Sequence, residues 1–341
     1  MCGIAGIQNI NSGLEYLDIR KITQCINHRG PDGLGTWKDD SSKVSLGHTR
    51  LSILDLSTAG SQPMILEDNL IIVFNGEVYN FIEIRKELLE KGYTFLSTSD
   101  TEVILASYKE WGLECFNKFN GMWALAIWDK KKRELLLSRD RYGVKPLYYF
   151  FNDGLLVFSS EIKAIHSFFD FKNPLNEVVI KDIARGSFDY HGTTSTYLQD
   201  VHSLPGGHNL IVKDNSLKVE EWYTIKKINV PSEFEGQVKE LRTLIFDACK
   251  IRLRSDVPVG TCLSGGVDSG SITSVINGFK ETEFNNYSHK GFCASFPETA
   301  IDESSKAKAL ADSLNVSLDI VPITPPGLEE LKQAMMQCVG E

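Results

Sequence analysis

Short apolar runs that favour β-structure, separated by turn residues, recur along the first part of the chain. Such runs predict strands, and we expect them at Cys2–Gln8, Val44–Leu51, Leu70–Asn75, Ala124–Asp129, Glu134–Arg139, Leu147–Phe151 and Leu155–Ser159. The sequence Asn152-Asp153-Gly154 lies between the last two runs and predicts the turn of a hairpin.

Two segments in this region show the spacing of helices instead. In Asn80–Lys91 the apolar residues recur at helical intervals, and Gly92 follows as a stop signal. Asp100–Gly112 follows a cap formed by Ser99 and Asp100. Strands mixed with helices in this way predict an α+β sandwich in which sheets pack between helices, with the layers αββα.

The pattern changes near Asp214, where the chain becomes polar and irregular as far as residue 235. We therefore expect one domain over 1–213, a linker over 214–235 and a second domain over 236–341. The second part predicts a helix at Glu235–Arg254 and strands at Val259–Leu263, Gly291–Phe296 and Ser317–Pro322, with helices at Ser269–Gly278 and Asp302–Leu314 between them. Strands alternating with helices predict an α/β domain with a doubly wound parallel sheet.

Composition narrows the class of protein. The 341 residues suffice for two domains, and 42% hydrophobic with 24% charged residues is typical of globular chains. A net charge of −9 argues against a nucleic-acid partner. No apolar run approaches the roughly 18 residues of a membrane span, so we expect no membrane partner. The seven cysteines are scattered without a CxxC pair, which indicates a reducing compartment, and we expect a cytoplasmic protein.

A glycine-rich loop follows the strand that closes at Leu263. Ser264–Ser269 reads Ser-Gly-Gly-Val-Asp-Ser at the entry to a helix. Consecutive glycines can present several N–H groups to an anion, and a helix N-terminus adds its positive dipole end. The loop lacks the Gly-Lys pair of the Walker motif, so it predicts a different kind of phosphate site. Asp268 is suited to hold Mg²⁺, directly or through water.

Cys2 follows the initiator Met directly. Removal of Met1 would leave thiol and α-amine on one residue, and the amine could take the thiol proton. Alone, a cysteine in second position is more simply explained as chance.

The motifs together resemble glutamine-hydrolysing asparagine synthetases. Segment Arg254–Ser269 is similar to that family's pyrophosphate loop. The first domain is similar to its class II glutamine amidotransferase domain, an N-terminal-nucleophile fold, at Met1–Gly6, His28–Asp32, His48–Ile53, Phe74–Asn80, Ser99–Glu102, Arg139–Leu147 and Ser159–Glu161. The resemblance spans essentially the whole chain.

This resemblance assigns roles in the first domain. Cys2 is the nucleophile, and the Asn75 side chain and the Gly76 backbone stabilise the oxyanion. Arg50 binds the α-carboxylate of glutamine and Asp100 its α-ammonium, while Glu77 and Asn75 help to orient the substrate. From the residues alone, Asn75-Gly76 is more simply a hairpin turn, Asp100 a helix cap and Arg50 a surface residue. The segment Tyr142–Pro146 can be explained as structural, and we assign it no catalytic role.

The resemblance also implies the overall reaction. Cys2 releases ammonia from glutamine, ATP adenylates a carboxylate and ammonia displaces AMP, which makes aspartate into asparagine. ATP would be a substrate with Mg²⁺, and no organic prosthetic group is implied. The ATP or pyrophosphate contacts fall on one segment: Leu263, Ser264, Gly265, Gly266, Asp268 and Ser269. A homodimer is left open.

The length of the second domain bears on the expected synthesis of asparagine. The second domain of the resembling family is longer, and its downstream Ser-Gly-Glu-Gly-Ala-Asp-Glu motif does not occur in this sequence. We therefore expect glutamine hydrolysis with little synthesis. Two alternatives stay open: a relative that amidates another carboxylate, on a surface sugar or peptide, and a shortened chain whose second domain only binds or regulates.

Overall fold

The computed structural model describes residues 1–9, 18–170, 172–187, 192–279 and 289–338. The chain divides into two compact units, Met1–Lys226 and Lys227–Met336, and each is described by itself. The division falls inside the expected 214–235 linker, but the start of that segment is not irregular. Ser216–Glu221 is a strand (β12) that pairs with β11, His208–Lys213. The prediction of a linker from residue 214 is wrong there, because Leu217 packs against the core of the first unit.

Two antiparallel six-stranded sheets form the first unit. One sheet has the order β10-β8-β9-β1-β3-β2, with strands Val201–Ser203, Tyr148–Asn152, Leu155–Ser159, Gly3–Asn9, Val44–Arg50 and Gly33–Asp39. The other has the order β12-β11-β7-β6-β5-β4, in which the four remaining strands are Glu134–Arg139, Gly121–Asp129, Leu70–Val78 and Met64–Leu66. We call them the β1 sheet and the β5 sheet.

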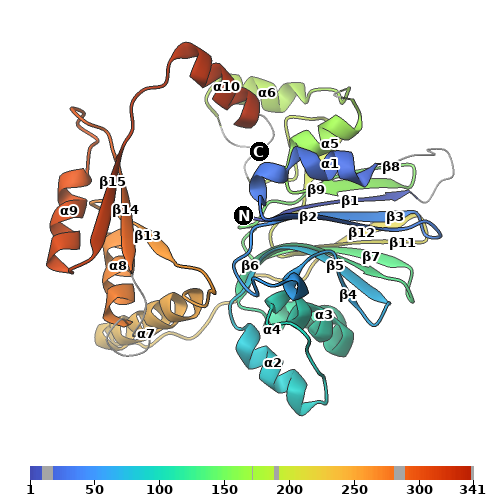
Figure 1. Ribbon diagram of the computed structural model, residues 1–341, viewed down its shortest axis with the longest axis horizontal. Helices are drawn as coiled ribbons and strands as arrows, with labels where there is room; N and C mark the ends of the chain where they lie inside the picture. Colours follow the sequence, from blue (N-terminus) through green and yellow to red (C-terminus); the bar gives the residue numbers. More distant parts are fainter. Residues whose placement is uncertain (10–17, 171, 188–191, 280–288, 339–341) are drawn as a thin grey trace. The chain divides into compact units, whose positions relative to one another are not determined.

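Helices cover the outer face of each sheet. Figure 1 shows α1 (Ile19–Cys25) and α5 (Ile162–Phe168) over the β1 sheet, and α2 (Phe81–Glu90), α3 (Asp100–Trp111) and α4 (Cys115–Lys118) over the β5 sheet. Apolar residues of these helices pack on the strands beneath them. The four layers confirm the predicted αββα sandwich.

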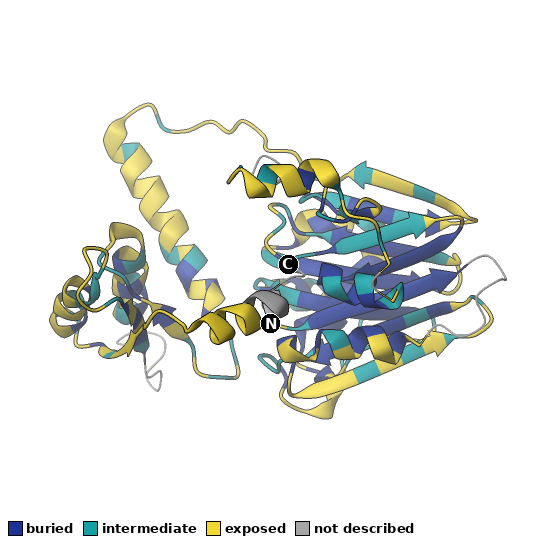
Figure 2. Cartoon of the chain, turned by 90° about the horizontal axis from the view of Figure 1, so that it is seen from above, coloured by how far each residue is buried: buried dark blue, intermediate teal, exposed yellow. Residues whose placement is uncertain are grey.

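The core between the two sheets is apolar and closed to water, and Figure 2 shows most of these strands as buried. Ile4 and Leu46 come from the β1 sheet, and Ile71, Val73 and Trp128 come from the β5 sheet. Side chains alternate between the two faces of a strand, so the next residues of the same parity also point into this space. This alternation determines which polar side chains reach the end of the core.

Several elements of the first unit were not predicted: β2, β4, β10, β11, α1, α5, α6 (Glu177–Ala184) and the 3₁₀ turns Asn27–Arg29, Thr58–Gly60 and Gly112–Glu114. Strand β2 reads Gly-Leu-Gly-Thr-Trp-Lys-Asp and is mostly exposed, so it lacks a continuous apolar run. It forms because every residue from Gly33 to Asp39 pairs with β3. The Asn152–Leu155 hairpin was predicted correctly.

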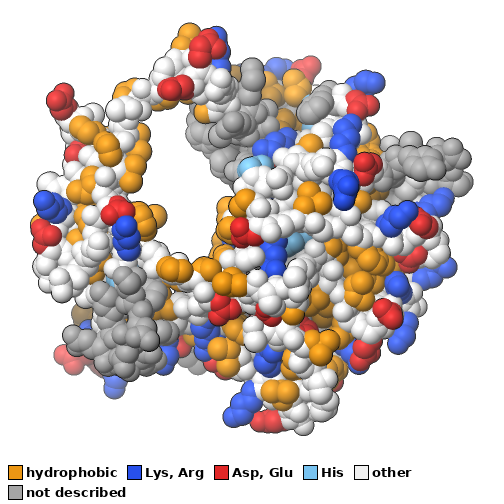
Figure 3. All heavy atoms as spheres, viewed as in Figure 1, with side chains coloured by type: hydrophobic (Ala, Val, Ile, Leu, Met, Phe, Trp, Pro, Cys, Tyr) orange, Lys and Arg blue, Asp and Glu red, His pale blue; other side chains and the backbone are white. Residues whose placement is uncertain are grey.

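The second unit holds a three-stranded parallel sheet, as predicted. Its strands are β13 (Gly260–Cys262), β14 (Lys290–Ser295) and β15 (Ser317–Pro322), in that order. Its helices are α7 (Phe234–Arg252), α8 (Val267–Phe279), α9 (Ser304–Ser313) and α10 (Leu328–Cys338). Hydrophobic side chains are exposed on this unit (Figure 3), among them Phe292, Ile320 and Val321 of the sheet. Within the described ranges, no helix has the length and apolar character that a membrane span requires.

Candidate active site

Strands from both sheets deliver polar side chains to one end of the inner core. On β5, Ile71 and Val73 point between the sheets, so Asn75 and Glu77 point the same way. Ile4 points there from β1, and Cys2 precedes it by two residues. The inner face of the sandwich therefore changes from apolar to chemically active side chains within two residues on each sheet.

The backbone of Gly76 points to an open edge of the β5 sheet. Gly76 lies opposite Trp123 of β6, but the Trp123 N–H donates to the Asp140 carboxylate (3.1 Å) and its carbonyl accepts from the Asp140 N–H (2.9 Å). Both backbone groups of Trp123 are thus directed away from β5, and in an antiparallel pair the same holds for Gly76. On the other side, β4 pairs with β5 only as far as Ile72.

Side chains occupy the positions on either side of Gly76 along this edge. The Phe74 N–H donates to Gln62 Oε1 at 2.6 Å, and the Phe74 carbonyl bonds to His48 Nε2 at 3.2 Å. The Val78 N–H donates to Asp100 Oδ2 at 2.9 Å. The Gly76 N–H lies between these two filled positions. A Cβ at Gly76 would come within 2.1 Å of the Met122 carbonyl, so only glycine fits.

Asn75 carries a second donor. Its side chain is 1% exposed, and Nδ2 has no hydrogen-bond partner among the described residues. A buried amide without a partner costs about 1–3 kcal/mol, which suggests a ligand that supplies an acceptor. The simpler interpretation of Asn75-Gly76 as a hairpin turn is wrong, because both residues lie inside β5.

Cys2 is held by its neighbours on two sides. Its Sγ accepts from the Leu51 N–H at 3.4 Å and donates to the Leu51 carbonyl at 3.5 Å. The Arg29 Nε donates to the Cys2 carbonyl at 3.1 Å, and the same guanidinium bonds to Glu161 at 2.9 Å. Burial raises the pKa of the Cys2 thiol, and the Leu51 N–H offsets part of that rise. The thiol is therefore protonated at neutral pH, and attack requires a base.

Two carboxyl groups face the same space. Burial raises the pKa of Glu77 to about 9, and the Asp100 charge adds to the rise. Burial also raises the pKa of Asp100, to about 6, against the opposing effect of N–H donors from Val78 and Thr101. Asp100 lies in the first turn of α3, which is capped by Ser99 rather than by Asp100 itself. At neutral pH the pair carries about one negative charge, on Asp100.

Arg50 ends β3 and is fixed by the following loop. One of its terminal nitrogens donates to the Ser57 carbonyl at 2.8 Å and the other to the Asp55 carbonyl. Gly60 makes room for this guanidinium, since a Cβ there would lie 2.4 Å from it. These partners are carbonyls, and no carboxylate within the described ranges forms an ion pair with Arg50.

A small pocket brings five of the predicted residues together: Cys2, Arg50, Gly76, Glu77 and Asp100 line it. Asn75 adjoins it from β5 but is not among the lining residues. The sequence did not single out Gln62 and Leu51, which also line it, because their roles depend on contacts between distant segments.

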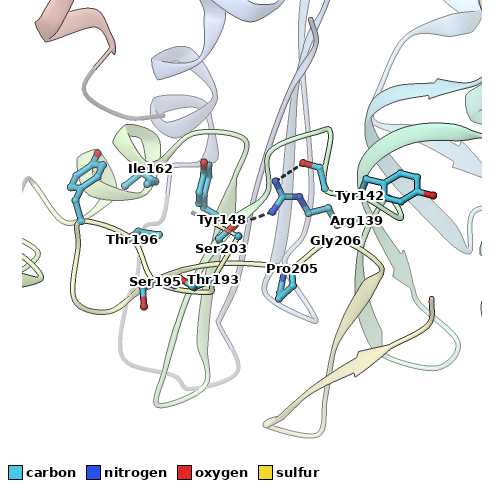
Figure 4. Close-up of a pocket in the computed structure, with 13 residues that line it drawn as sticks. Arg139, Tyr142, Tyr148, Ile162, Thr193, Ser195, Thr196, Ser203, Pro205 and Gly206 are labelled. Atoms are coloured by element: carbon cyan, nitrogen blue, oxygen red, sulfur yellow. Dashed lines mark hydrogen bonds between the residues drawn. The ribbon is translucent and has the colours of Figure 1, made fainter. Parts of the chain in front are cut away.

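The loop after β7 is fixed from two sides. The Asp140 carboxylate accepts the N–H groups of Tyr142, Val144 and Lys145 within 3.1 Å. Arg139 donates to the Lys145 carbonyl at 2.7 Å and also to Gly143 and Ser203, as the dashed lines in Figure 4 show for the last two. The pocket drawn there has a volume of about 460 Å³, and Arg139 is the charged residue among its described lining residues. Because its guanidinium nitrogens already donate to the protein, Arg139 has few N–H groups left for a ligand in this pocket.

In the second unit the predicted phosphate segment does form a loop at a helix N-terminus. Helix α8 begins at Val267, two residues earlier than predicted, so Asp268 lies in its first turn. The Ser264 and Ser269 hydroxyls bond to each other at 2.9 Å, and the Gly265 N–H donates to Glu303 Oε2 at 3.3 Å. The Glu303 carboxylate therefore already accepts a hydrogen bond from one N–H group of this loop. Leu263 is buried and continues the β13 pairing.

Asp268 fits one mode of Mg²⁺ binding. No cluster of three His, Cys, Asp or Glu side chains suited to a metal occurs in the described part of the chain. A single carboxylate beside a phosphate loop is the arrangement in which substrate phosphates supply most of the Mg²⁺ ligands. The role of Asp268 stays a prediction.

Comparison with known proteins identifies the two regions. Residues 1–223 match the family model for a glutamine amidotransferase domain, and residues 240–341 match that for asparagine synthase. Asparagine synthetase [glutamine-hydrolyzing] 1 of Bacillus subtilis is 37% identical over 325 residues, 93% of this chain and 49% of the relative. The amidase chry2 of Gibberella zeae is 34% identical over 89% of this chain and 46% of the relative.

The chain spans about half the length of the curated relatives it matches. Among solved structures, the glutamine phosphoribosylpyrophosphate amidotransferase of Bacillus subtilis, complexed with ADP and GMP, matches with a TM-score of 0.50 and 18% identity, over 97% of this chain and 70% of that one. That likeness supports the fold alone.

Proposed function

The chain belongs to the glutamine amidotransferase family, and we propose that its first unit hydrolyses glutamine with Cys2 as the nucleophile. The observation that carries this proposal is the Asn75 amide, buried and without a partner among the described residues, beside a pocket lined by Cys2 and Gly76. A nucleophile next to two unused N–H donors is the arrangement that acyl transfer requires.

Glutamine would be held by its charged end. The Arg50 guanidinium suits the α-carboxylate, and the Asp100 carboxylate suits the α-ammonium. Glu77 carries a proton at neutral pH, because its pKa is raised to about 9, and it would orient the substrate as a hydrogen-bond donor. The side-chain amide then points toward Cys2.

The chemistry follows from these positions. Removal of Met1 frees the Cys2 α-amine, which takes the thiol proton as Sγ attacks the amide carbon. The oxygen of the tetrahedral intermediate is stabilised by the Gly76 N–H and Asn75 Nδ2. The amine returns the proton to the leaving nitrogen, so ammonia and a thioester form, and water then releases glutamate and regenerates the thiol.

For the second unit we propose that Ser264–Ser269 binds the pyrophosphate end of ATP. The loop at the α8 N-terminus presents N–H groups and hydroxyls, and a triphosphate would displace Glu303 from Gly265. Mg²⁺, when bound, would neutralise phosphate charge there. In the whole reaction a carboxylate is adenylated and ammonia displaces AMP.

We propose aspartate as the acceptor carboxylate. Aspartate is favoured because relatives at 36–37% identity are named asparagine synthetases. The similarity to amidase chry2 favours keeping a different carboxylate as the second candidate. A chain that binds or regulates without synthesis is the third.

Single-substrate assays separate these functions. Glutamate release from glutamine without ATP, abolished by Cys2→Ser, is the expected result for the first unit. Pyrophosphate release that depends on aspartate would support asparagine synthesis. Glutamate release without aspartate-dependent pyrophosphate would leave another acceptor or a regulatory role, and absence of glutamate release would overturn the proposal.

A further inference from the structure

Asp55 lies in the loop after β3 and is bonded to both segments that carry the proposed partners of the substrate's charged end. It is 7% exposed, and its backbone carbonyl accepts from the Arg50 guanidinium. Its carboxylate oxygen Oδ2 accepts from the Thr98 N–H at 2.8 Å, two residues before Asp100. One buried residue therefore links the loop that holds Arg50 to the loop that leads into α3.

The carboxylate of Asp55 is bonded by the protein at both oxygens. The second oxygen, Oδ1, accepts from the Ser57 N–H at 3.1 Å and from the Ser57 hydroxyl at 2.5 Å. Burial would raise the pKa of Asp55, but hydrogen bonds from Ser57 and Thr98 hold it below its usual value, so the carboxylate is charged at neutral pH. Asp55 is also not among the described residues that line the pocket. Its carboxylate thus acts on other residues rather than on a ligand.

The other anchors of the loop before α3 come from the helix layer itself. Arg85 of α2 donates to the Ser97 and Ser99 carbonyls at 2.7 and 2.9 Å. Glu102 of α3 accepts from the Ser97 N–H at 2.7 Å. These bonds fix the loop to α2 and α3, and the Asp55 carboxylate adds a connection to the loop that holds the proposed carboxylate-binding residue.

An α-amino acid needs such a connection. Its carboxylate and its ammonium are borne by one carbon atom, so the two groups that bind them must be held at a fixed spacing. Arg50 and Asp100 both line the pocket, but they come from different layers of the sandwich. Arg50 ends β3 of the β1 sheet, whereas Asp100 begins α3, which covers the β5 sheet (Figure 1).

We propose that Asp55 is a positioning residue that sets the spacing between Arg50 and Asp100 and so makes the pocket selective for an α-amino acid. This inference rests on the proposed glutaminase function. Loss of the carboxylate releases the loop before α3 from the loop after β3, while the carbonyl that binds Arg50 remains. Asp100 is then placed less precisely, and the hydrogen bonds that hold Cys2 are unchanged.

Glutaminase kinetics of Asp55→Gly and Asp55→Asn test this role. The φ of Asp55 is 51°, a region that Gly and Asn both adopt readily, so the backbone can stay in place for Arg50. Gly lacks both acceptor oxygens, whereas Asn keeps one and turns an NH₂ group toward the other donor. KM for glutamine should rise about tenfold in Asp55→Gly and less in Asp55→Asn, while kcat changes little. Alkylation of Cys2 by iodoacetamide, measured on the N-terminal peptide, should keep its rate.

Asp39→Gly is the matched control. The Asp39 carboxylate accepts from the Ser41 N–H and hydroxyl at 3.0 and 2.6 Å, as Asp55 does from Ser57, and its further donor is the adjacent Ser42 N–H. The same kind of local turn is therefore lost without a connection to a distant loop. KM should stay that of the original chain, and thermal melting verifies that each variant is folded.

A double variant separates positioning from general damage. In the Asp100→Asn background, Asp55→Gly should raise KM little further, because the residue through which it acts has already lost its charge. KM values for the Asp55 variants equal to that of Asp39→Gly, or an undiminished further rise in the Asp100→Asn background, would overturn the inference. Absence of glutamate release from the original chain would instead overturn the proposed function.

Discussion

The Asp100 carboxylate accepts a hydrogen bond from the Val78 N–H at 2.9 Å, which joins the first turn of α3 to the open edge of β5. This bond holds a buried charge two residues from Gly76. It also occupies the edge position next to Gly76. The Gly76 N–H is therefore the free donor at this edge, and Gly76 lines the same pocket as Cys2. The edge of β5 thus positions Asp100, the proposed partner of the substrate's ammonium group, and also supplies the Gly76 N–H, the proposed oxyanion donor.

Asp100→Asn tests the ammonium site. The amide oxygen can still accept from Val78, but the charge is lost, so KM for glutamine should rise about 10- to 100-fold while kcat changes less. In the original protein KM should also rise below pH of about 6, because the pKa of Asp100 is near there and only the ionised form attracts the ammonium. Steady-state kinetics against pH measure both, and a KM insensitive to the substitution would contradict the assignment.

Asn75→Ala tests the oxyanion donor. Loss of one such donor costs about 10²–10³ in kcat. Because the described residues leave Nδ2 without a partner, its removal breaks no hydrogen bond of the fold, and the unfolding free energy should change by no more than about 1 kcal/mol. Glutaminase kinetics and thermal melting measure the two effects. A large loss of stability with unchanged kcat would indicate a structural role instead.

Gly60→Ala tests the position of Arg50 without touching it. The added Cβ would lie 2.4 Å from the guanidinium, so Arg50 must move and KM for glutamine should rise about tenfold or more. Gly33→Ala is the control, since a Cβ there has ordinary contact with Arg50 at 3.8 Å. Equal KM values for the two variants would argue against the Arg50 assignment.

Glu77→Gln tests the electrostatics of the pair through stability. The folded-state pKa of Glu77 is raised to about 9 from an ordinary value of 4.5, so its contribution to stability is present below pH 4.5 and is lost as pH rises toward 9. The neutral glutamine does not incur this loss. The variant should therefore melt higher than the original protein at pH 8, and the difference should shrink toward pH 5. Parallel melting curves at all pH values would contradict this account.

Much of the architecture could be predicted from the sequence, because apolar runs and turn residues are local signals. The strands at Glu134–Arg139, Leu155–Ser159 and Ser317–Pro322 have the predicted bounds. Strand β5 runs three residues further than predicted, because pairing of Asn75–Val78 with β6 overrides the weak strand preference of Asn, Gly and Glu. Strand β12 was missed for the same reason.

The candidate site depends more than the strands do on contacts between distant segments of the chain. Motif resemblance selected residues from four separate segments, and five of them line one pocket. Gln62 had no such signal, since it matters only through contacts that the fold creates. The unbonded state of Asn75 Nδ2 among the described residues cannot be read from a sequence at all.

Covalent modification of Cys2 tests the proposed nucleophile directly. Protein lacking Met1 is incubated with an electrophilic analogue of glutamine, and the adduct is located by peptide mass spectrometry while glutamate release is followed. We predict one adduct, on Cys2, that glutamine prevents and that abolishes glutamate release. Full glutamate release from a protein modified at Cys2, or from Cys2→Ser, would contradict the central claim.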